Sequence, residues 1–292
     1  MSRIVVLGDV MVDVVVRLSE PLAPGSDAEA AISFHGGGSA ANTAAWLAAA
    51  GAEPVLVGSV GDDGRGRRTL GELRAGGVDA RLAVDPSLPT GTCLVLVAPD
   101  GERTMAPDAG ANDAFREEDL GDLLDSGGHL HVSGYALLRE GSRPAARAAI
   151  ARARASGMTV SVDASSSALL SERFLDDAAG ADLMVANASE AHALTGESAP
   201  ERAGRLLAAR FAEVVVKLGP EGALWTDGDE MLSVAAVPVE AVVDSTGAGD
   251  AFAAGLLAAR VDGASTADAL AAGCRLAARA VTTPGARPPR RP

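Results

Sequence analysis

The chain is poor in cysteine and aromatic residues, and Lys217 is its only lysine among 292 residues. Cys93 and Cys274 are too few and too far apart in sequence for a disulfide framework or a CxxC metal site, which fits a reducing cytoplasm. The formal net charge is −14, whereas binding to a phosphate backbone needs clustered Lys and Arg. The composition therefore predicts no nucleic-acid partner.

Long apolar runs are missing as well. The first apolar stretch, at residues 4–7, has the length of a strand, stops at Gly8-Asp9 and shows no signal-peptide cleavage pattern. No run approaches the roughly 20 residues that cross a bilayer. We therefore expect no membrane partner and a cytoplasmic protein. The length allows one large α/β domain or two small ones.

Short β-branched segments alternate with Ala-, Arg- and Leu-rich segments of helical pattern. The strand-like segments are residues 4–7, 55–57, 129–132, 159–162, 183–185 and 214–218, and the clearest helical ones are 39–50, 143–155 and 202–211. This alternation predicts an α/β fold with helices on both faces of a mostly parallel sheet. His129 and His131 fall on one of these strands, and we interpret them as core residues and not as metal ligands.

Two regions, at about residues 12–34 and 80–106, interrupt the alternation with successive strand-like segments and no helix between them. We interpret them as one small β-sheet lid over an edge of the main sheet, within a single domain at residues 1–292. Ordinary surface hairpins are the alternative.

The most informative segment runs from Asp244 to Gly255. The apolar run at 237–243 predicts a strand, 245–249 a glycine turn, and 250–260 a helix. First-turn amides of such a helix have no intrahelical acceptor and attract an anion. Asp250 in that turn is placed to take a proton from a hydroxyl, although a merely capped helix is the other interpretation. The segment matches neither a P-loop nor a dinucleotide fingerprint.

A second glycine-rich segment, at residues 36–44, also leads into a helix and contains Asn42. An Asn side chain both donates and accepts hydrogen bonds, and the carboxylate of Asp13 can accept from two neighbouring hydroxyls. This pair suits a neutral sugar. A local helix cap for Asn42 and a solvated strand-edge position for Asp13 are the alternatives.

In this order and about 200 residues apart, the two glycine-rich segments resemble the signatures of the ribokinase-like (PfkB) carbohydrate kinase family. The resemblance covers nearly the whole chain, and the matching motifs are Gly8 to Asp13, Gly37-Gly38-x-x-x-Asn42, Gly58-x-x-Gly61-x-Asp63, Asn187-x-x-Glu190, Lys217-Leu-Gly219 and Asp244 to Gly255. It implies a ribokinase-like three-layer α/β/α sandwich with a small β-sheet lid. It also implies an ATP-dependent kinase that phosphorylates a sugar hydroxyl.

The resemblance assigns roles residue by residue. The catalytic base is Asp250, and the anion hole is made by Gly247, Ala248 and Gly249. The substrate-binding residues are Asp13, Gly37, Gly38 and Asn42. The nucleotide-binding residues are Asn187, Lys217, Gly219 and Thr246, and Glu190 matches the residue that arranges Mg²⁺ through water. The residues matching a monovalent cation site, for K⁺, are Asp244, Ala280 and Gly285.

The sequence leaves the substrate open, because relatives with this framework serve ribose, fructose, ketodeoxygluconate or nucleosides such as adenosine. Arg103 is a candidate to clamp a substrate carboxylate or phosphate, with an exposed hairpin arginine as the alternative. Phe34 suits either stacking on a base or sugar, or packing within the lid. Scarce aromatics favour a sugar over a nucleoside. A non-catalytic binding protein on this fold is the competing class, and the resemblance implies a homodimer through the lid.

Overall fold

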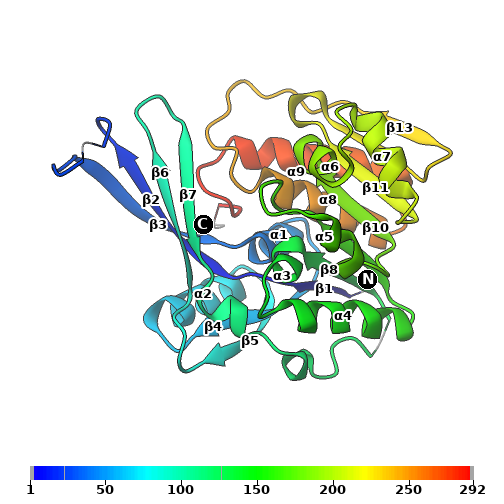
Figure 1. Ribbon diagram of the computed structural model, residues 1–292, viewed down its shortest axis with the longest axis horizontal. Helices are drawn as coiled ribbons and strands as arrows, with labels where there is room; N and C mark the ends of the chain where they lie inside the picture. Colours follow the sequence, from blue (N-terminus) through cyan, green and yellow to red (C-terminus); the bar gives the residue numbers. More distant parts are fainter. Residues whose placement is uncertain (1–2, 23, 126, 290–292) are drawn as a thin grey trace.

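A large sheet forms the centre of the protein and a small one projects from its side, as a computed structural model describing residues 3–22, 24–125 and 127–289 shows (Figure 1). The order of the large sheet is β13 (Met231–Val234), β12 (Ala223–Thr226), β11 (Glu213–Lys217), β10 (Leu183–Asn187), β9 (Thr159–Asp163), β8 (His129–Ser133), β1 (Ile4–Leu7), β4 (Pro54–Gly61) and β5 (Asp79–Asp85). Only the pairings of β12 with β11 and β13 are antiparallel among these described strands. The predicted, mostly parallel sheet is confirmed.

Helices cover both faces of this sheet. One face carries α3 (Gly134–Leu138), α4 (Arg143–Ala155), α5 (Glu172–Asp177), α6 (Ala188–Thr195) and α7 (Pro200–Ala208). The other carries α1 (Ser39–Ala49), α2 (Gly64–Ala75), α8 (Ala248–Val261) and α9 (Thr266–Val281). Short 3₁₀ turns lie at η1 (Gly110–Ala114), η2 (Glu117–Leu120) and η3 (Gly219–Glu221). In the described part of the chain, none of these helices is both long and apolar enough to cross a bilayer.

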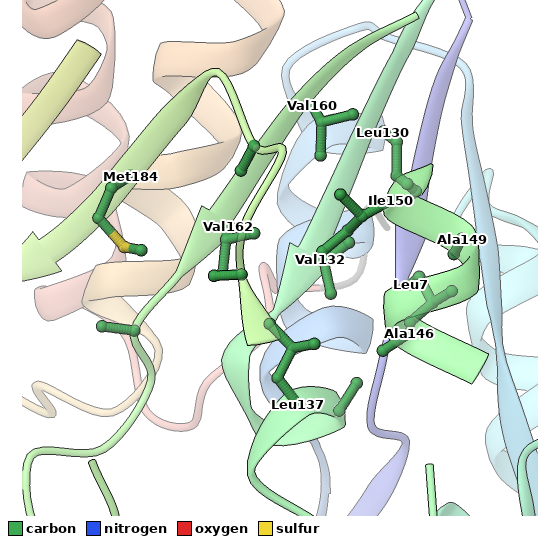
Figure 2. Close-up of a cluster of buried hydrophobic side chains, with 14 of the residues drawn as sticks. Leu7, Leu130, Val132, Leu137, Ala146, Ala149, Ile150, Val160, Val162 and Met184 are labelled. Carbon is green, nitrogen blue, oxygen red and sulfur yellow. The ribbon is translucent and has the colours of Figure 1, made fainter. Parts of the chain in front are cut away.

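The alternation of side chains along β1 explains the three layers. Val5 and Leu7 point into the core under α3 to α7, part of which Figure 2 shows, whereas Ile4 and Val6 point into the core under α1, α2, α8 and α9. Successive side chains of a strand point to opposite faces, so a strand that is apolar throughout needs cover on both. The three-layer α/β/α sandwich expected from the sequence is confirmed.

The small sheet is the lid. Its order is β3 (Ala30–Gly37), β2 (Met11–Leu18), β6 (Gly91–Val97) and β7 (Arg103–Asp108). Alternate residues of β6 are buried, Cys93, Val95 and Val97 on one side, whereas Leu94 on the other is exposed. The lid therefore has an inner, buried face and an outer face open to solvent.

Two sequence predictions about this architecture are wrong in part. The lid region predicted at about 80–106 starts too early, because β5 pairs in parallel with β4 and belongs to the large sheet. The strand predicted at 237–243 is irregular in the structure. Pro238 has no N–H for a ladder, and the backbone N–H of Val243 donates instead to Val281 O, 2.8 Å away. The segment leaves the sheet to reach α8.

The interpretation of the two histidines is confirmed. His129 and His131 are buried on β8, and each ring bonds to the hydroxyl of Ser161, with N···O distances of 2.7 and 2.8 Å. Burial lowers the pKa of His129 to about 3 and that of His131 to about 4. Both rings are therefore neutral core residues at pH 7.

Candidate active site

A cavity of about 1050 Å³ lies where the parallel strands end, between the large sheet and the inner face of the lid. Parallel strands bring their carboxyl ends to one edge of a sheet, which gathers the residues that follow them. The expected site residues in its wall are Asp13, Gly38, Asn42, Asn187, Glu190, Lys217, Gly219, Thr246, Gly247, Ala248, Gly249 and Asp250. The expected residues outside the wall are Gly37, Arg103, Asp244, Ala280 and Gly285.

Asp250 lies in the first turn of α8, half-buried, and α1 supplies both of its hydrogen-bond donors. Ser39 Oγ donates to Oδ1 at 2.8 Å, and Asn42 Nδ2 donates to Oδ2 at 2.9 Å. Burial raises the pKa of Asp250 to about 7, even though both hydrogen bonds act to lower it. A carboxylate with a pKa near neutral pH, held in a fixed orientation, is suited to accept a proton from a substrate.

Two glycines stand at the start of α8, and the first is required by the backbone. Gly247 has φ of 76°, and a Cβ there would collide with the backbone of Ala286. A Cβ on Gly249 would lie 3.2 Å from Lys217 Nζ, so this ammonium group sits directly beside the helix N-terminus. First-turn amides and a nearby cation together make this end of the cavity attractive to phosphate.

Asp13, Gly37 and Asn42 come together beneath the lid. A side chain at Gly37 would collide with the carboxylate of Asp13, which explains why glycine stands there. Burial raises the pKa of Asp13 to about 6, against the lowering effect of the Arg287 guanidinium. These groups line up as the sequence predicts for binding a polyol, a role that stays a prediction.

Arg287 is a site residue that the sequence analysis missed. Its Nη2 donates to Gly37 O at 2.7 Å and its Nε donates to Asn42 Oδ1 at 3.3 Å. Because the guanidinium holds the amide oxygen of Asn42, the amide nitrogen is left to face Asp250. Burial lowers the pKa of Arg287 to about 10, so it remains a cation at neutral pH.

The two loops expected to flank a monovalent cation do meet. The Asp244 carboxylate accepts hydrogen bonds from Thr246 N at 2.9 Å and Gly285 N at 3.1 Å. Burial acts to raise its pKa, but these donors outweigh burial and the pKa of Asp244 is lowered. The carbonyl oxygen of Ala280 accepts from Thr283 Oγ1 at 3.0 Å.

Arg103 reaches from β7 of the lid to this same loop. Its Nη1 lies 2.9 Å from Asp244 Oδ1 and donates to Thr246 Oγ1 at 2.7 Å. The guanidinium is therefore an ion-pair partner of Asp244 and ties the lid to the loop before α8. Arg103 is an exposed residue of a lid hairpin, as the alternative interpretation has it, and the substrate clamp stays a prediction.

The opposite end of the cavity is built by residues that follow β9, β10 and β11. Asn187 and Glu190 form a reciprocal capping box on α6, with hydrogen bonds of 2.7 and 2.8 Å. Lys217 Nζ is paired with Asp163 Oδ2 at 2.7 Å. Burial raises the pKa of Glu190. Burial acts against the Lys217 cation too, but the carboxylates of Asp163 and Glu190 outweigh it and its pKa is raised. Sequence reasoning missed Asp163, whose only signal is its place at the end of a buried strand.

Asp9 is another residue that sequence reasoning missed. Its carboxylate accepts from Ser39 N and from Ser133 Oγ, both at 2.9 Å. Gly38, the residue before α1, makes no side-chain cap, so Asp9 caps this helix from the end of β1. It thereby fixes the turn that carries Ser39 and Asn42 toward Asp250.

Tyr135 and Arg139, on the segment after β8, also line the cavity and carried no sequence signal. The Arg139 guanidinium stands over the Tyr135 ring, 6.0 Å from its centre. Burial, together with the carboxylate of Asp9, raises the pKa of Tyr135 to about 12, so its hydroxyl stays protonated.

The chain is similar to a known protein family and to several solved structures. The family model described as "pfkB family carbohydrate kinase" matches residues 1–292. The ATP-dependent ribose-1-phosphate kinase of Halopiger xanaduensis is 36% identical over 265 residues, which cover 88% of this chain and 84% of that protein. The crystal structure of adenosine kinase from Sinorhizobium meliloti is similar, with a TM-score of 0.90, 29% identity, and coverage of 98% and 96%. A putative ribokinase II from E. coli, solved with ATP and Mg²⁺, has a TM-score of 0.86 and 26% identity, covering 98% of this chain and 94% of that one.

Proposed function

The chain belongs to the PfkB family of carbohydrate kinases, and we therefore propose that Asp250 is the general base that activates a substrate hydroxyl for phosphorylation by ATP. The supporting observation is the setting of this carboxylate. It has a pKa of about 7, is oriented by Ser39 and Asn42, and lies in the first turn of a helix whose amides open on the same cavity. A base and an anion-binding helix N-terminus are thus held side by side.

The reaction is a direct in-line transfer. The substrate hydroxyl loses its proton to Asp250 while its oxygen forms a bond to the γ-phosphorus of ATP. The bond from that phosphorus to the oxygen bridging the β-phosphate breaks, and ADP leaves with that electron pair. The amides of Gly247, Ala248 and Gly249 face the phosphoryl oxygens and stabilise their developing charge, and Lys217 beside Gly249 adds a cation. No covalent enzyme intermediate is needed.

We assign the donor nucleotide to the apolar part of the cavity wall beside α9. The wall there is apolar and irregular, formed by Val237, Val242, Ala277, Ala278 and Val281. Such a surface suits the flat base of a nucleotide, and the irregular backbone at 237–243 supplies part of it. The triphosphate would then extend toward Lys217 and the start of α8.

The carboxylates of Asp163 and Glu190 fit a magnesium ion that is held through water. No group of three or more acidic, histidine or cysteine side chains converges as a metal site in the described residues, so the ion would take its other ligands from phosphate and water. Burial raises the pKa of Glu190, and a nearby cation would favour its charged form. When bound, Mg²⁺ supplies neutralisation of the donor phosphates.

A sugar is favoured as acceptor over a nucleoside. Phe34, the lid aromatic considered for stacking on a base, pairs in register with Val14, which in turn pairs with Leu94 on the outer face. It is 54% exposed and points away from the cavity. A nucleoside acceptor remains the second candidate, since the similar structure from Sinorhizobium meliloti is an adenosine kinase.

A monovalent cation, K⁺ above all, would have to share Asp244 with Arg103. The carboxylate, the Thr246 segment and the Gly285 loop are arranged as the family resemblance implies, but the guanidinium already lies 2.9 Å from Asp244 Oδ1. We therefore propose that potassium activates the enzyme only modestly, because an internal cation takes part of its place.

The outer face of the lid supports the proposed homodimer. Ile32, Phe34 and Leu94 share this face by register and are 61%, 54% and 38% exposed. An exposed apolar sheet face of this kind is costly for a monomer in water and suits a second copy of the chain. Sedimentation analysis should give a dimer, and Phe34→Asp should give a monomer. A monomeric parent protein contradicts this proposal.

A coupled ADP-release assay tests the function itself. The panel contains neutral sugars, sugar acids, sugar phosphates and nucleosides, each with and without K⁺, and the Asp250→Asn variant serves as the blank. We expect ADP release with at least one sugar class and loss of that signal in the blank. Silence across the panel would favour the competing class, a non-catalytic binding protein on this fold.

A further inference from the structure

Arg139 is a cation in the cavity wall that no carboxylate of the described residues neutralises. It directly follows α3, and its Nε is buried without a hydrogen-bond partner. Among the described residues, no acidic side chain forms an ion pair with it, and its contact is the stacking over Tyr135. An N–H group that is removed from water usually gains a hydrogen-bond acceptor in exchange, and for a guanidinium an anionic acceptor meets the charge as well.

The other cation in the wall behaves differently. Lys217 is paired with Asp163 at 2.7 Å and has Glu190 nearby, so its charge is satisfied within the protein. Arg139 therefore retains its charge for a molecule in the cavity. The stacking on Tyr135 holds the planar group in place, which reduces the entropy lost when a ligand binds.

The side of the cavity on which Arg139 lies indicates which molecule it meets. It also lines a small recess with Gly8, Ser59 and Asn112, residues of the segment after β1, of β4 and of the turn after the lid. No residue of β9, β10 or β11, the strands that carry the donor-side groups, contributes to this recess. Asp9, which accepts a hydrogen bond from Ser39 N at the start of α1, lines both this recess and the main cavity, and we therefore assign Arg139 to the acceptor side.

Three carboxylates lie in the rest of that wall. Asp9, Asp13 and Asp250 line the same cavity on the acceptor side. An acceptor that carries a negative charge would be repelled there unless a cation meets its anionic group. For a neutral sugar, by contrast, an unpaired arginine adds no benefit and costs desolvation.

We propose that Arg139 binds an anionic substituent, a phosphate or a carboxylate, on the sugar that this enzyme phosphorylates. The acceptor is then a sugar phosphate or a sugar acid, with its free hydroxyl at Asp250 and its anionic group at Arg139. This inference rests on the proposed kinase function and narrows its substrate class.

Calorimetric titration tests this without requiring turnover. Saturating AMP-PCP with Mg²⁺ keeps the donor phosphate site filled, so that an anionic sugar cannot bind there. D-ribose, D-ribose 1-phosphate and D-ribonate are then compared, as are D-fructose and D-fructose 1-phosphate. We expect one anionic form to bind about 10- to 100-fold more tightly than its neutral counterpart, the gain typical of charge-assisted hydrogen bonds. The phosphate and carboxylate arms identify which anion is used.

Two variants and a control assign the effect to Arg139. Arg139→Met, of similar length, should abolish the preference for the anionic sugar, and Arg139→Lys should keep part of it. The lysine variant also keeps the test meaningful should the methionine variant fold poorly. The control is Arg152→Met, which removes a surface arginine that pairs with Asp125 and should leave the preference unchanged.

The outcomes separate this proposal from the proposed function. Equal or weaker binding of every anionic sugar overturns the role of Arg139, as does an Arg139→Met variant that loses affinity for AMP-PCP and not for the sugar. Turnover of neutral sugars with no anionic preference leaves the kinase standing and refutes the subsite. Tight, Arg139-dependent binding of an anionic sugar without any turnover supports the subsite and refutes the proposed function.

Discussion

Replacing Asp250 with asparagine should destroy activity and, at the same time, remove a pH-dependent cost to folding. The folded-state pKa of Asp250 is about 7, against an ordinary value of 3.8. Between these values the folded protein keeps a proton that the unfolded chain releases, so the stability of the parent falls as pH rises toward 7. An asparagine side chain does not titrate, and the variant escapes this loss.

The size of the effect follows from the shift. Each pKa unit corresponds to about 1.36 kcal/mol, so the parent would lose about 2.7 kcal/mol between pH 5 and pH 8 through this group. Asp250 is half-buried and faces the cavity, and solvent screening reduces this figure to about 1 kcal/mol. The asparagine amide can turn its oxygen toward Asn42 and its nitrogen toward the Ser39 hydroxyl, which accepts as well as donates, and this rearrangement is the same at both pH values.

Urea denaturation of parent and variant at pH 5 and pH 8 measures this double difference. The stability of Asp250→Asn relative to the parent should rise by about 1 kcal/mol from pH 5 to pH 8, while turnover falls by about 100- to 10,000-fold, the usual contribution of a general base. Asp262→Asn, an exposed position at the other end of α8, is the control and should follow the parent in both assays. A relative stability that does not change with pH, or turnover near that of the parent, would refute the reasoning.

Three further predictions test the surroundings of the site. Arg287→Met should lower turnover about tenfold, because Asn42 loses its fixed orientation and donates less well to Asp250. The pKa of Asp250 then rises, and the acidic limb of the rate profile moves to higher pH. An unshifted profile would mean that Arg287 acts only on folding. Arg103→Met should increase the ratio of activity with and without K⁺, since Asp244 loses its internal cation, and an unchanged ratio contradicts that competition. Between pH 7 and pH 5, His131→Asn should lose about 2 kcal/mol less stability than the parent. The parent holds a neutral imidazole with a pKa of about 4, which protonates more readily once the chain unfolds. Equal losses in urea denaturation would show that this ring does not govern acid sensitivity.

Local chemistry made much of the site predictable from sequence. The turn at 245–249 and the helix after it depend on glycine conformation and on the free amides of a first turn, which neighbouring residues determine. Gly247 indeed has φ of 76° and begins α8, and Gly255 is where a Cβ would strike the backbone of Ala272 in α9. The capping box of Asn187 and Glu190 is equally local.

Pairing between distant segments was less predictable. The run at 237–243 is β-branched, but a strand also needs a second strand to pair with, and this run joins no ladder in the described part of the chain. β5 follows a helix and has the pattern of a lid strand, but it pairs in parallel with β4 and therefore belongs to the large sheet. A strand pattern specifies a face and a length, whereas its partner is chosen by the rest of the fold.

Periodicity and turn chemistry act over a few residues, and for that reason the order of amino acids alone specifies an α/β protein with a glycine turn before a helix and an acid in the first turn of that helix. What surrounds that acid depends on the folded chain. Asn42 and Arg287, 245 positions apart, meet beside Asp250, and Arg103 crosses from the lid to Asp244. Arg139 is left without a counter-ion in the wall of the same cavity, within the part of the chain that the structure describes. Tertiary folding determines which of these charged side chains are paired and which are not. Their roles therefore cannot be predicted from sequence spacing.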